Sequence, residues 1–156
     1  MIKIDIPGFK QIDAEHLVLD FNGTLAIDGL FIEGVIGKLV QISENLKVHV
    51  LTADTFHTVQ NELRDLPIII KILETAEQDN QKLHYIKNLG SDNVIAIGNG
   101  KNDILMLKEA ALSIGIIQAE GVYSQILNDT QVICTNINDA LSLLINPKRL
   151  LATLRN

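Results

Sequence analysis

Residues 16–24 read His16-Leu17-Val18-Leu19-Asp20-Phe21-Asn22-Gly23-Thr24 and are the most informative part of the sequence for its fold. This stretch opens with an unbroken apolar run, ends that run on an acid, and continues into a small polar turn. A short continuous run of Leu and Val is typical of a strand that is buried on both faces of a sheet. Gly23 permits the tight turn that follows. The stretch therefore predicts a central strand over residues 16–20 that presents Asp20 at its carboxyl end.

Further apolar runs of strand length follow along the chain, and segments of helical periodicity separate them. We expect strands at residues 47–52, 68–73, 93–97, 112–117 and 131–134. We expect helices at residues 33–45, 54–65, 78–89, 101–111, 120–128 and 136–146, with Pro147 ending the last one. This alternation favours an α/β fold with a doubly wound, Rossmann-like parallel sheet. Residues 1–15 are expected to form a small N-terminal hairpin, and residues 1–156 a single domain.

Composition narrows the class of protein. The chain has 156 residues, of which 47% are hydrophobic and 21% charged, as is typical of a globular domain. Its net charge is −6 and it contains no basic run, which argues against nucleic acid and membrane surfaces as partners. No run approaches the roughly 20 apolar residues of a membrane span, and the N-terminus lacks the apolar stretch of a signal peptide. We therefore expect a cytoplasmic protein.

Polar elements punctuate the expected strand ends. Asp20 ends the first long strand, Thr52 ends the next, and the turn Gly98-Asn99-Gly100-Lys101-Asn102-Asp103 follows a third. Lys82 lies early in an expected helix. Because ligands of doubly wound sheets bind at the carboxyl ends of the strands, these groups are candidates for one site. By contrast, His16 and His49 lie in or beside strands without metal-ligand spacing and are interpreted as satisfied structural residues.

In this order, the four elements resemble the motifs of the haloacid dehalogenase-like superfamily: Asp-x-Asp-x-Thr, then a Thr or Ser, a Lys, and an acidic Gly-Asp-x-x-x-Asp turn. The resemblance spans residues 16–146. It is closer still to small proteins that look like the phosphorylation core of P-type ATPases, on the stretches Leu19-Asp20-Phe21-Asn22-Gly23-Thr24-Leu25-Ala26, Leu51-Thr52-Ala53-Asp54-Thr55-Phe56 and Ile97-Gly98-Asn99-Gly100-Lys101-Asn102-Asp103. It implies a Mg²⁺-dependent phosphohydrolase or phosphotransferase.

The resemblance also assigns roles to individual residues. It implies that the Asp20 carboxylate is the nucleophile that accepts the phosphoryl group. Thr52, with Ala53 beside it, and the turn at Gly23 would bind the phosphoryl oxygens. Lys82 would neutralise charge near Asp20 and the transferring group. The substrate class implied is a phosphorylated small molecule or a nucleotide.

The same resemblance implies a Mg²⁺ site. Its protein ligands would be Asp20, the backbone carbonyl of Asn22, and Asp103, with Asn99 as a further ligand or an outer contact. Two of these positions depart from the phosphatase pattern. Asn22 stands where phosphatases carry a general acid and base, and an amide cannot transfer that proton. Asn99 replaces the first acid of the fourth motif, so the site has one formal negative charge fewer.

These departures leave alternatives open. The first is an enzyme with an aspartyl-phosphate intermediate. The second is a phosphoryl-binding regulatory or partner protein with little turnover because of Asn22. A response-regulator receiver is a third, but its phosphorylated Asp lies on the third strand. Near the second motif, Asp54 is interpreted as a helix cap and a reserve candidate base, while His57 is a weaker candidate for the pocket edge.

The short spacing between motifs leaves no room for a cap domain. Residues 25–32 can form only a small flap, a hairpin turning at Asp28-Gly29. The site should therefore be open, and either a large substrate or a neighbouring subunit would cover it. The apolar residues Leu150, Leu151 and Leu154 suggest a homo-oligomer as the second possibility.

Overall fold

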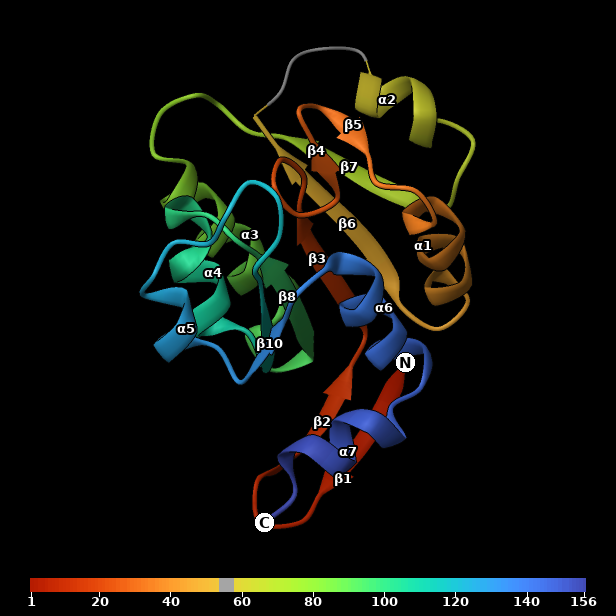
Figure 1. The fold of residues 1–156 in the computed structure, drawn as a ribbon, viewed down its shortest axis with the longest axis vertical. Helices are drawn as coiled ribbons and strands as arrows, with labels where there is room; N and C mark the ends of the chain where they lie inside the picture. The colour runs from red at the N-terminus through yellow and green to blue at the C-terminus, as the bar shows by residue number, and fades with distance from the viewer. Residues whose placement is uncertain (54–57) are drawn as a thin grey trace.

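The computed structural model describes residues 1–53 and 58–156 of the chain, except for the side chain of Thr58. Its centre is a sheet of six parallel strands in the order β10-β9-β8-β3-β6-β7 (Figure 1). The strands are β3 (His16–Asp20), β6 (Lys47–Thr52), β7 (Ile68–Ile72), β8 (Val94–Gly98), β9 (Leu112–Ile116) and β10 (Val132–Cys134). The predicted doubly wound parallel sheet is confirmed.

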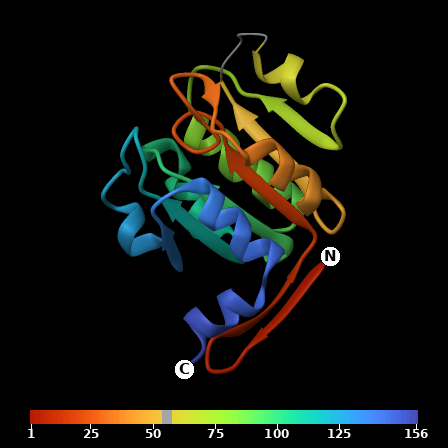
Figure 2. The ribbon, with the colours of Figure 1, turned by 45° about the vertical axis from the view of Figure 1, so that its right-hand side comes forward.

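Helices cover both faces of this sheet. Helices α1 (Val35–Ser43) and α6 (Ile137–Ile145) pack together on one face. Helices α3 (Gln78–Leu89) and α4 (Ile104–Glu109) pack together on the other (Figure 2). Two short helices complete the layers, α2 (Thr58–Leu63) and α5 (Ile126–Asp129). None of the helices in the described part of the chain is both long and apolar enough to cross a bilayer.

The core decides which way Asp20 points. Every residue of β3 is buried, so the strand is covered on both faces. Leu17 and Leu19 belong to the apolar cluster on the α1 and α6 side, whereas Val18 belongs to the cluster beneath α3 and α4. Because side chains alternate along a strand, Asp20 shares the face of Val18. It therefore points toward the side on which α3 and α4 lie.

The N-terminal hairpin lies apart from the central sheet, as expected. Strands β1 (Ile2–Ile6) and β2 (Lys10–Ala14) form a separate antiparallel pair. A helix that the sequence did not predict, α7 (Lys148–Leu154), packs against this pair (Figure 1). Pro147 separates α6 from α7 and immediately precedes the new helix, because its fixed φ and missing N–H suit a helix start. Leu150 is fully buried, and Leu151 and Leu154 pack on the same core. These leucines therefore cover the chain's own hairpin and no longer support a homo-oligomer.

Two other expectations change in detail. The helix expected at residues 120–128 is present only as α5, and the chain from residue 117 to Gln125 forms no regular helix. The helix expected at residues 101–111 begins as the short 3₁₀ turn η2 (Lys101–Asp103) and continues as α4. A second such turn, η1 (Ser91–Asn93), precedes β8. Between residue 117 and Gln125, bonds to other segments, such as that from the Tyr123 N–H to the Asn99 carbonyl, replace the helical ladder.

The predicted flap is present as the two-strand hairpin β4 (Ala26–Ile27) and β5 (Leu30–Phe31). Asp28 and Gly29 both have positive φ, 51° and 76°, as a two-residue type I′ turn requires. Between β3 and β6 the chain forms only this hairpin and α1. The absence of a cap at this position is therefore confirmed.

Candidate active site

The candidate site lies where the order of the strands reverses. From β3 the chain passes to its neighbour β6 and then to β7, and it returns to β8 on the opposite side of β3. The carboxyl ends of β3 and β8 thus lie at the switch point, where doubly wound sheets bind ligands. Asp20 ends β3, and Gly98 ends β8.

The Lys82 ammonium joins the two acids of this site. Lys82 Nζ lies 2.6 Å from Asp20 Oδ1 and 2.6 Å from Asp103 Oδ1. Lys82 is 1% exposed, Asp103 is fully buried, and Asp20 is 8% exposed. Helix α3 supplies Lys82, while the turn after β8 supplies Asp103. Asp20, Lys82 and Asp103, named here the charged cluster, therefore form one buried ionic unit.

Backbone groups fix the Asp103 carboxylate. Its second oxygen, Oδ2, accepts hydrogen bonds from the N–H groups of Asn99, at 3.0 Å, and Gly100, at 2.8 Å. A Cβ at Gly98 would lie 2.6 Å from this carboxyl group, so close approach requires the glycine. Three donors thus occupy the two Asp103 oxygens, which makes this residue a fixed negative charge beside Lys82.

The electrostatics of the charged cluster are unbalanced. Two carboxylates face one ammonium, which leaves one surplus negative charge when all three groups are ionised. Burial, and next the Asp103 charge, raise the pKa of Asp20 to about 7, although Lys82 opposes this. Burial alone would lower the pKa of Lys82, but the charges and hydrogen bonds of Asp103 and Asp20 raise it above its usual value. The cluster therefore favours an additional cation.

The turn after β3 closes mainly on itself. The Phe21 carbonyl accepts from the N–H groups of Thr24, Leu25 and Ala26, and the Gly23 N–H donates to the Ala26 carbonyl at 2.8 Å. Gly23 has φ +78°, and a Cβ there would collide with the Asn99 amide. We expected the Gly23 turn to direct N–H groups at phosphate. The Gly23 and Thr24 N–H groups bond within the turn, and phosphate binding at this turn stays a prediction.

The remaining predicted residues take up positions around this turn. Thr24 is buried, and its hydroxyl donates to Asn99 Oδ1 at 3.1 Å, which supports the turn. Thr52 is 2% exposed at the end of β6, one residue beyond Leu51, the register partner of Asp20. Ala53 is partly buried against the apolar cluster beneath α3 and α4. The expectations for Asp54 and His57 lie outside the described residues.

The oxygen donors here fit a hard cation in part. Asp20 offers a carboxylate and Asn22 a backbone carbonyl, which are ligand types that Mg²⁺ prefers. Asp103 and Asn99 fit less directly, because protein donors already occupy the Asp103 oxygens and Thr24 occupies Asn99 Oδ1. No group of three or more His, Cys, Asp or Glu side chains suited to a metal occurs in the described residues. The surplus negative charge remains the stronger indication of a cation.

Two comparisons of sequence place the chain in a family. The family model of haloacid dehalogenase-like hydrolases matches residues 73–142. An uncharacterised protein of Methanocaldococcus jannaschii is 41% identical over 87 residues, which cover 56% of this chain and 84% of that protein. The chain belongs to the haloacid dehalogenase-like superfamily.

Other relatives of this haloacid dehalogenase-like protein are much larger. The probable phospholipid-transporting ATPase IM of Homo sapiens is 28% identical over 119 residues, or 73% of this chain. Those residues cover 10% of that ATPase, so the chain spans about a tenth of its length. The likeness to P-type ATPases is therefore confirmed for the part that the chain shares with them.

Solved structures confirm the fold of the superfamily. The 3-deoxy-D-manno-octulosonate 8-phosphate phosphatase of Moraxella catarrhalis, in complex with magnesium ion, phosphate ion and its sugar acid, matches with a TM-score of 0.67 at 18% identity. The match covers 92% of this chain and 94% of that one. The cobalt-bound octulosonate 8-phosphate phosphatase of Haemophilus influenzae matches with a TM-score of 0.70 at 13% identity. That match covers 88% of this chain and 90% of the phosphatase. At such identities the likeness concerns the fold.

The haloacid dehalogenase-like fold also brings together residues that sequence reasoning missed. Gln118 lies at the end of the β9 run, and its side chain bonds the turn after β3. A polar residue directly after a buried strand was the signal that identified Asp20 and Thr52, so it would also have indicated Gln118. The segment was instead expected to lead into a helix.

A second buried cluster lies on the same sheet face. His16 Nδ1 lies 2.9 Å from His49 Nε2, and His49 Nδ1 lies 2.9 Å from the Tyr85 hydroxyl. Desolvation lowers the pKa of His49 to about 4, with further lowering from the His16 and Lys47 charges. His16, His49 and Tyr85, named here the histidine cluster, confirm that both histidines are satisfied structural residues.

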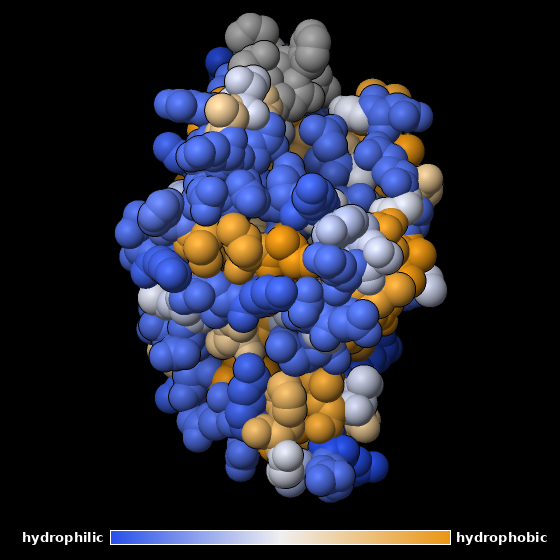
Figure 3. Space-filling view, turned by 90° about the vertical axis from the view of Figure 1, so that its left-hand side faces the viewer, coloured by the Kyte–Doolittle hydropathy of each residue, from blue (hydrophilic) through white to orange (hydrophobic). Residues whose placement is uncertain are grey.

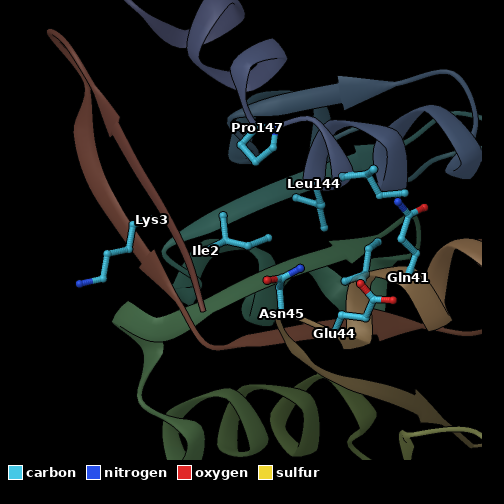
Figure 4. A pocket seen from close by; sticks show the side chains of 9 residues that line it. Ile2, Lys3, Gln41, Glu44, Asn45, Leu144 and Pro147 are labelled. Atoms are coloured by element: carbon cyan, nitrogen blue, oxygen red, sulfur yellow. The ribbon is translucent and has the colours of Figure 1, made fainter.

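Two cavities differ in their relation to the charged cluster. A cavity of about 500 Å³ lies beside the start of α3 and η2, and its lining includes Gln78, Lys101, Asn102 and Tyr123. Gln78 is one helical turn from Lys82, and Asn102 precedes Asp103. Another, of about 300 Å³, lies between the N-terminal hairpin, α1 and α6, around Ile2 and Leu144 (Figure 4). Of these two cavities, the one lined by Gln78 and Asn102 is adjacent in sequence to the candidate site.

The surface on the side where α4 and α5 lie is mostly hydrophilic, with a band of apolar residues (Figure 3).

Proposed function

We propose that the chain is a divalent-cation-dependent phosphohydrolase or phosphotransferase that forms an aspartyl phosphate at Asp20. The observation that carries this proposal is the buried Lys82 ammonium, 2.6 Å from both Asp20 and Asp103, at the switch point of the sheet. A carboxylate can attack phosphorus when neighbouring positive charge offsets the repulsion between two anions. Lys82 supplies one such charge, and the surplus negative charge of the cluster favours another.

In the first step, an Asp20 carboxylate oxygen attacks the phosphorus atom, and the bond from phosphorus to the leaving oxygen breaks. Lys82 stabilises the charge of the transferring group, and Thr52 donates a hydrogen bond to it. In the second step, water or another acceptor attacks the same phosphorus and restores the Asp20 carboxylate. Mg²⁺, held by Asp20 and the Asn22 carbonyl with Asp103 and Asn99 around them, would neutralise negative charge during both steps.

Asn22 sets the balance between the two steps. The amide cannot protonate the leaving group, so the leaving oxygen takes its proton from solvent. It also cannot deprotonate the attacking water, which slows the second step. Phosphoryl donors with a good leaving group, such as acetyl phosphate, should therefore phosphorylate Asp20. Release of the phosphoryl group from Asp20 should be slow. This property favours a second candidate, a phosphoryl-binding regulatory or partner protein that uses the same pocket with little turnover.

The adjoining cavity suggests where the rest of the substrate lies. Most of the residues that line it are polar or charged, although they expose apolar as well as polar surface, and an Asn102 Nδ2 hydrogen bond to Gln78 Oε1, at 2.8 Å, fixes part of the wall. Lys101 adds a positive charge and Tyr123 an aromatic ring. A phosphorylated small molecule or a nucleotide would place its non-phosphoryl part there. The substrates of the octulosonate phosphatases belong to the first of these classes.

The decisive experiment is capture of the phosphoryl group. Fresh protein is mixed with acetyl phosphate and Mg²⁺, and its intact mass is followed over time. We expect the mass of one added phosphoryl group, absent in Asp20→Asn and after removal of the cation by a chelator. A phosphatase screen with sugar phosphates, nucleotides and p-nitrophenyl phosphate then separates the two candidates. Failure to capture phosphoryl from any donor, together with no turnover in the screen, would contradict both.

A further inference from the structure

Residues 118–123, named here the strap, lie between β9 and α5 and bond the turn after β3. Gln118 Nε2 donates to the carbonyl oxygens of Gly23, at 2.9 Å, and Thr24, at 2.8 Å. Gln118 Oε1 accepts from the Ile137 N–H, at 3.0 Å, at the start of α6. One side chain therefore links the turn after Asp20 to the first residue of α6.

Other strap residues bond the same region. The Gly121 carbonyl accepts from Asn99 Nδ2 at 3.0 Å, and the Tyr123 N–H donates to the Asn99 carbonyl at 2.8 Å. Glu120 accepts from the Asp28 N–H, at 2.9 Å, in the flap. The strap thus contacts the turn that follows Asp20, the fourth motif and the flap.

The orientation of the Gln118 amide follows from its partners. Carbonyl oxygens can only accept and a backbone N–H can only donate, so Nε2 must face Gly23 and Thr24, and Oε1 must face Ile137. Both ends of the amide are therefore used. The turn needs such support because glycine restricts the backbone little at Gly23, and most of the turn's other bonds are internal, apart from the Thr24 hydroxyl bond to Asn99.

We propose that Gln118 is a positioning residue, whose amide holds the turn so that Asn22 lies correctly beside the Asp20 carboxylate. The inference rests on the proposed function for its chemical consequence. Its structural part, the immobilisation of the turn, is independent of that function. Gln118 touches neither Asp20 nor the transferring group.

Two variants separate the bonds of Gln118. Gln118→Glu can still accept from Ile137 but cannot donate to Gly23 and Thr24. Gln118→Leu loses all three bonds. Gln131→Leu is the matched control, because Gln131 Oε1 accepts from the N–H and hydroxyl of Ser113 at the opposite end of β9. The three variants thus differ in whether the turn beside Asp20 loses its support.

Two measurements are made on the intact chain. Amide hydrogen exchange by NMR reports the mobility of residues 22–26. Titration with beryllofluoride and Mg²⁺, which mimic a phosphoryl group on a carboxylate, reports the binding geometry of Asp20. Both Gln118 variants lose the two hydrogen bonds to the turn, so both should speed exchange there and weaken beryllofluoride binding about tenfold or more. Gln131→Leu should lower thermal stability and leave both readouts unchanged.

The outcomes distinguish the inference from the proposed function. If wild-type protein does not bind beryllofluoride, the proposed function is overturned, and exchange alone decides whether Gln118 holds the turn. If wild type binds it, but the Gln118 variants match wild type in exchange and affinity, the inference is overturned. It is also overturned if Gln131→Leu changes both readouts as strongly, because a general loss of stability would then explain them.

Discussion

Two buried polar clusters lie under the same helix, and they differ in charge. The charged cluster and the histidine cluster both take one residue from β3, Asp20 and His16, and one from α3, Lys82 and Tyr85. The charged cluster lies at the carboxyl end of the sheet and keeps a surplus negative charge. The histidine cluster begins at the opposite end of β3. Burial lowers the pKa of both His16 and His49, which favours their neutral forms. Burial alone therefore does not indicate function.

The two clusters differ in how far their own groups meet one another's hydrogen-bonding needs and balance one another's charges. In the histidine cluster, a chain of donors and acceptors from Tyr85 through His49 to His16 pairs the facing ring nitrogens without any charge. Such a cluster stabilises the packing of α3 on the sheet. In the charged cluster, burial and the Asp103 charge raise the pKa of Asp20 to about 7, so Lys82 offsets only part of the cost of burying its carboxylate. A cluster that lacks a counter-charge at a strand end is suited to bind one.

The largest expected effect comes from removing the Lys82 ammonium, which is the positive charge of the charged cluster. Lys82→Met should slow phosphorylation of Asp20 by about 10²-fold or more, because charge stabilisation of the transferring group is lost. Tyr85→Phe, one turn along the same helix, should leave the rate within a few-fold and cost about 1–3 kcal/mol of unfolding free energy. Intact-mass time courses with acetyl phosphate and urea denaturation measure the two effects. Equal effects on the rate would erase the distinction between the clusters.

The next effect concerns release of the phosphoryl group. Asn22→Asp should raise steady-state turnover by about 10²- to 10⁴-fold, the typical contribution of a general acid and base. Inorganic phosphate release in the presence of Mg²⁺ measures it. The Gly23 N–H is committed to the Ala26 carbonyl, which hinders its attack on the Asn22 side chain and so opposes deamidation of wild type.

A matched control adds the same charge elsewhere. Asn128→Asp, on α5, should leave turnover unchanged. If fresh wild-type protein turns over as fast as Asn22→Asp, another residue acts as the base. The assignment of Asn22 would then be wrong, and Asp54 would be the first residue to substitute.

The two clusters should give opposite pH dependences of stability in metal-free protein. The pKa of Asp20 is raised from 3.8 to about 7, so its stabilising contribution is lost as the pH rises through 7. The pKa of His49 is lowered from 6.5 to about 4, so its contribution is lost as the pH falls from 6.5 toward 4. Urea denaturation across this range should show a steeper rise with pH in Asp20→Asn and a flatter one in His49→Gln. The same slope in both variants would contradict these shifts.

The smallest effect tests whether the charged cluster opens into the adjoining cavity. Lys101→Ala should raise KM for a phosphorylated substrate a few-fold with little change in kcat, since an exposed charge contributes about 1 kcal/mol or less. Lys108→Ala is the control, because Lys108 is half exposed and pairs with Asp129 instead. Steady-state kinetics on the best substrate of the phosphatase screen provide the comparison. An unchanged KM in Lys101→Ala would remove Lys101 from the substrate site.

Much of the fold was predictable because its signals are local. The buried run of β3, the period of α3 and the Asp28-Gly29 turn each depend on residues that are close in sequence. Helix α7 was not predicted, because a proline can follow the end of one helix and can also precede the start of another. The second helix forms here because it packs on the N-terminal hairpin. The helix expected at residues 120–128 was too long, since tertiary bonds of the strap replace helical ones there.

The pattern of strands and turns was enough to predict that Asp20, Thr52 and the turn before Asp103 lie at one edge of the sheet, because parallel strands place their carboxyl ends there. The place of Lys82 beside the two acids followed from the family resemblance, since a helical lysine carries no such signal. The donors that each oxygen meets depend on the tertiary packing. The bonds from Gln118 to Gly23 and Thr24, and from His16 to His49, join residues far apart in the chain. Such bonds depend on the packing of several elements at once, and no local pattern encodes that packing.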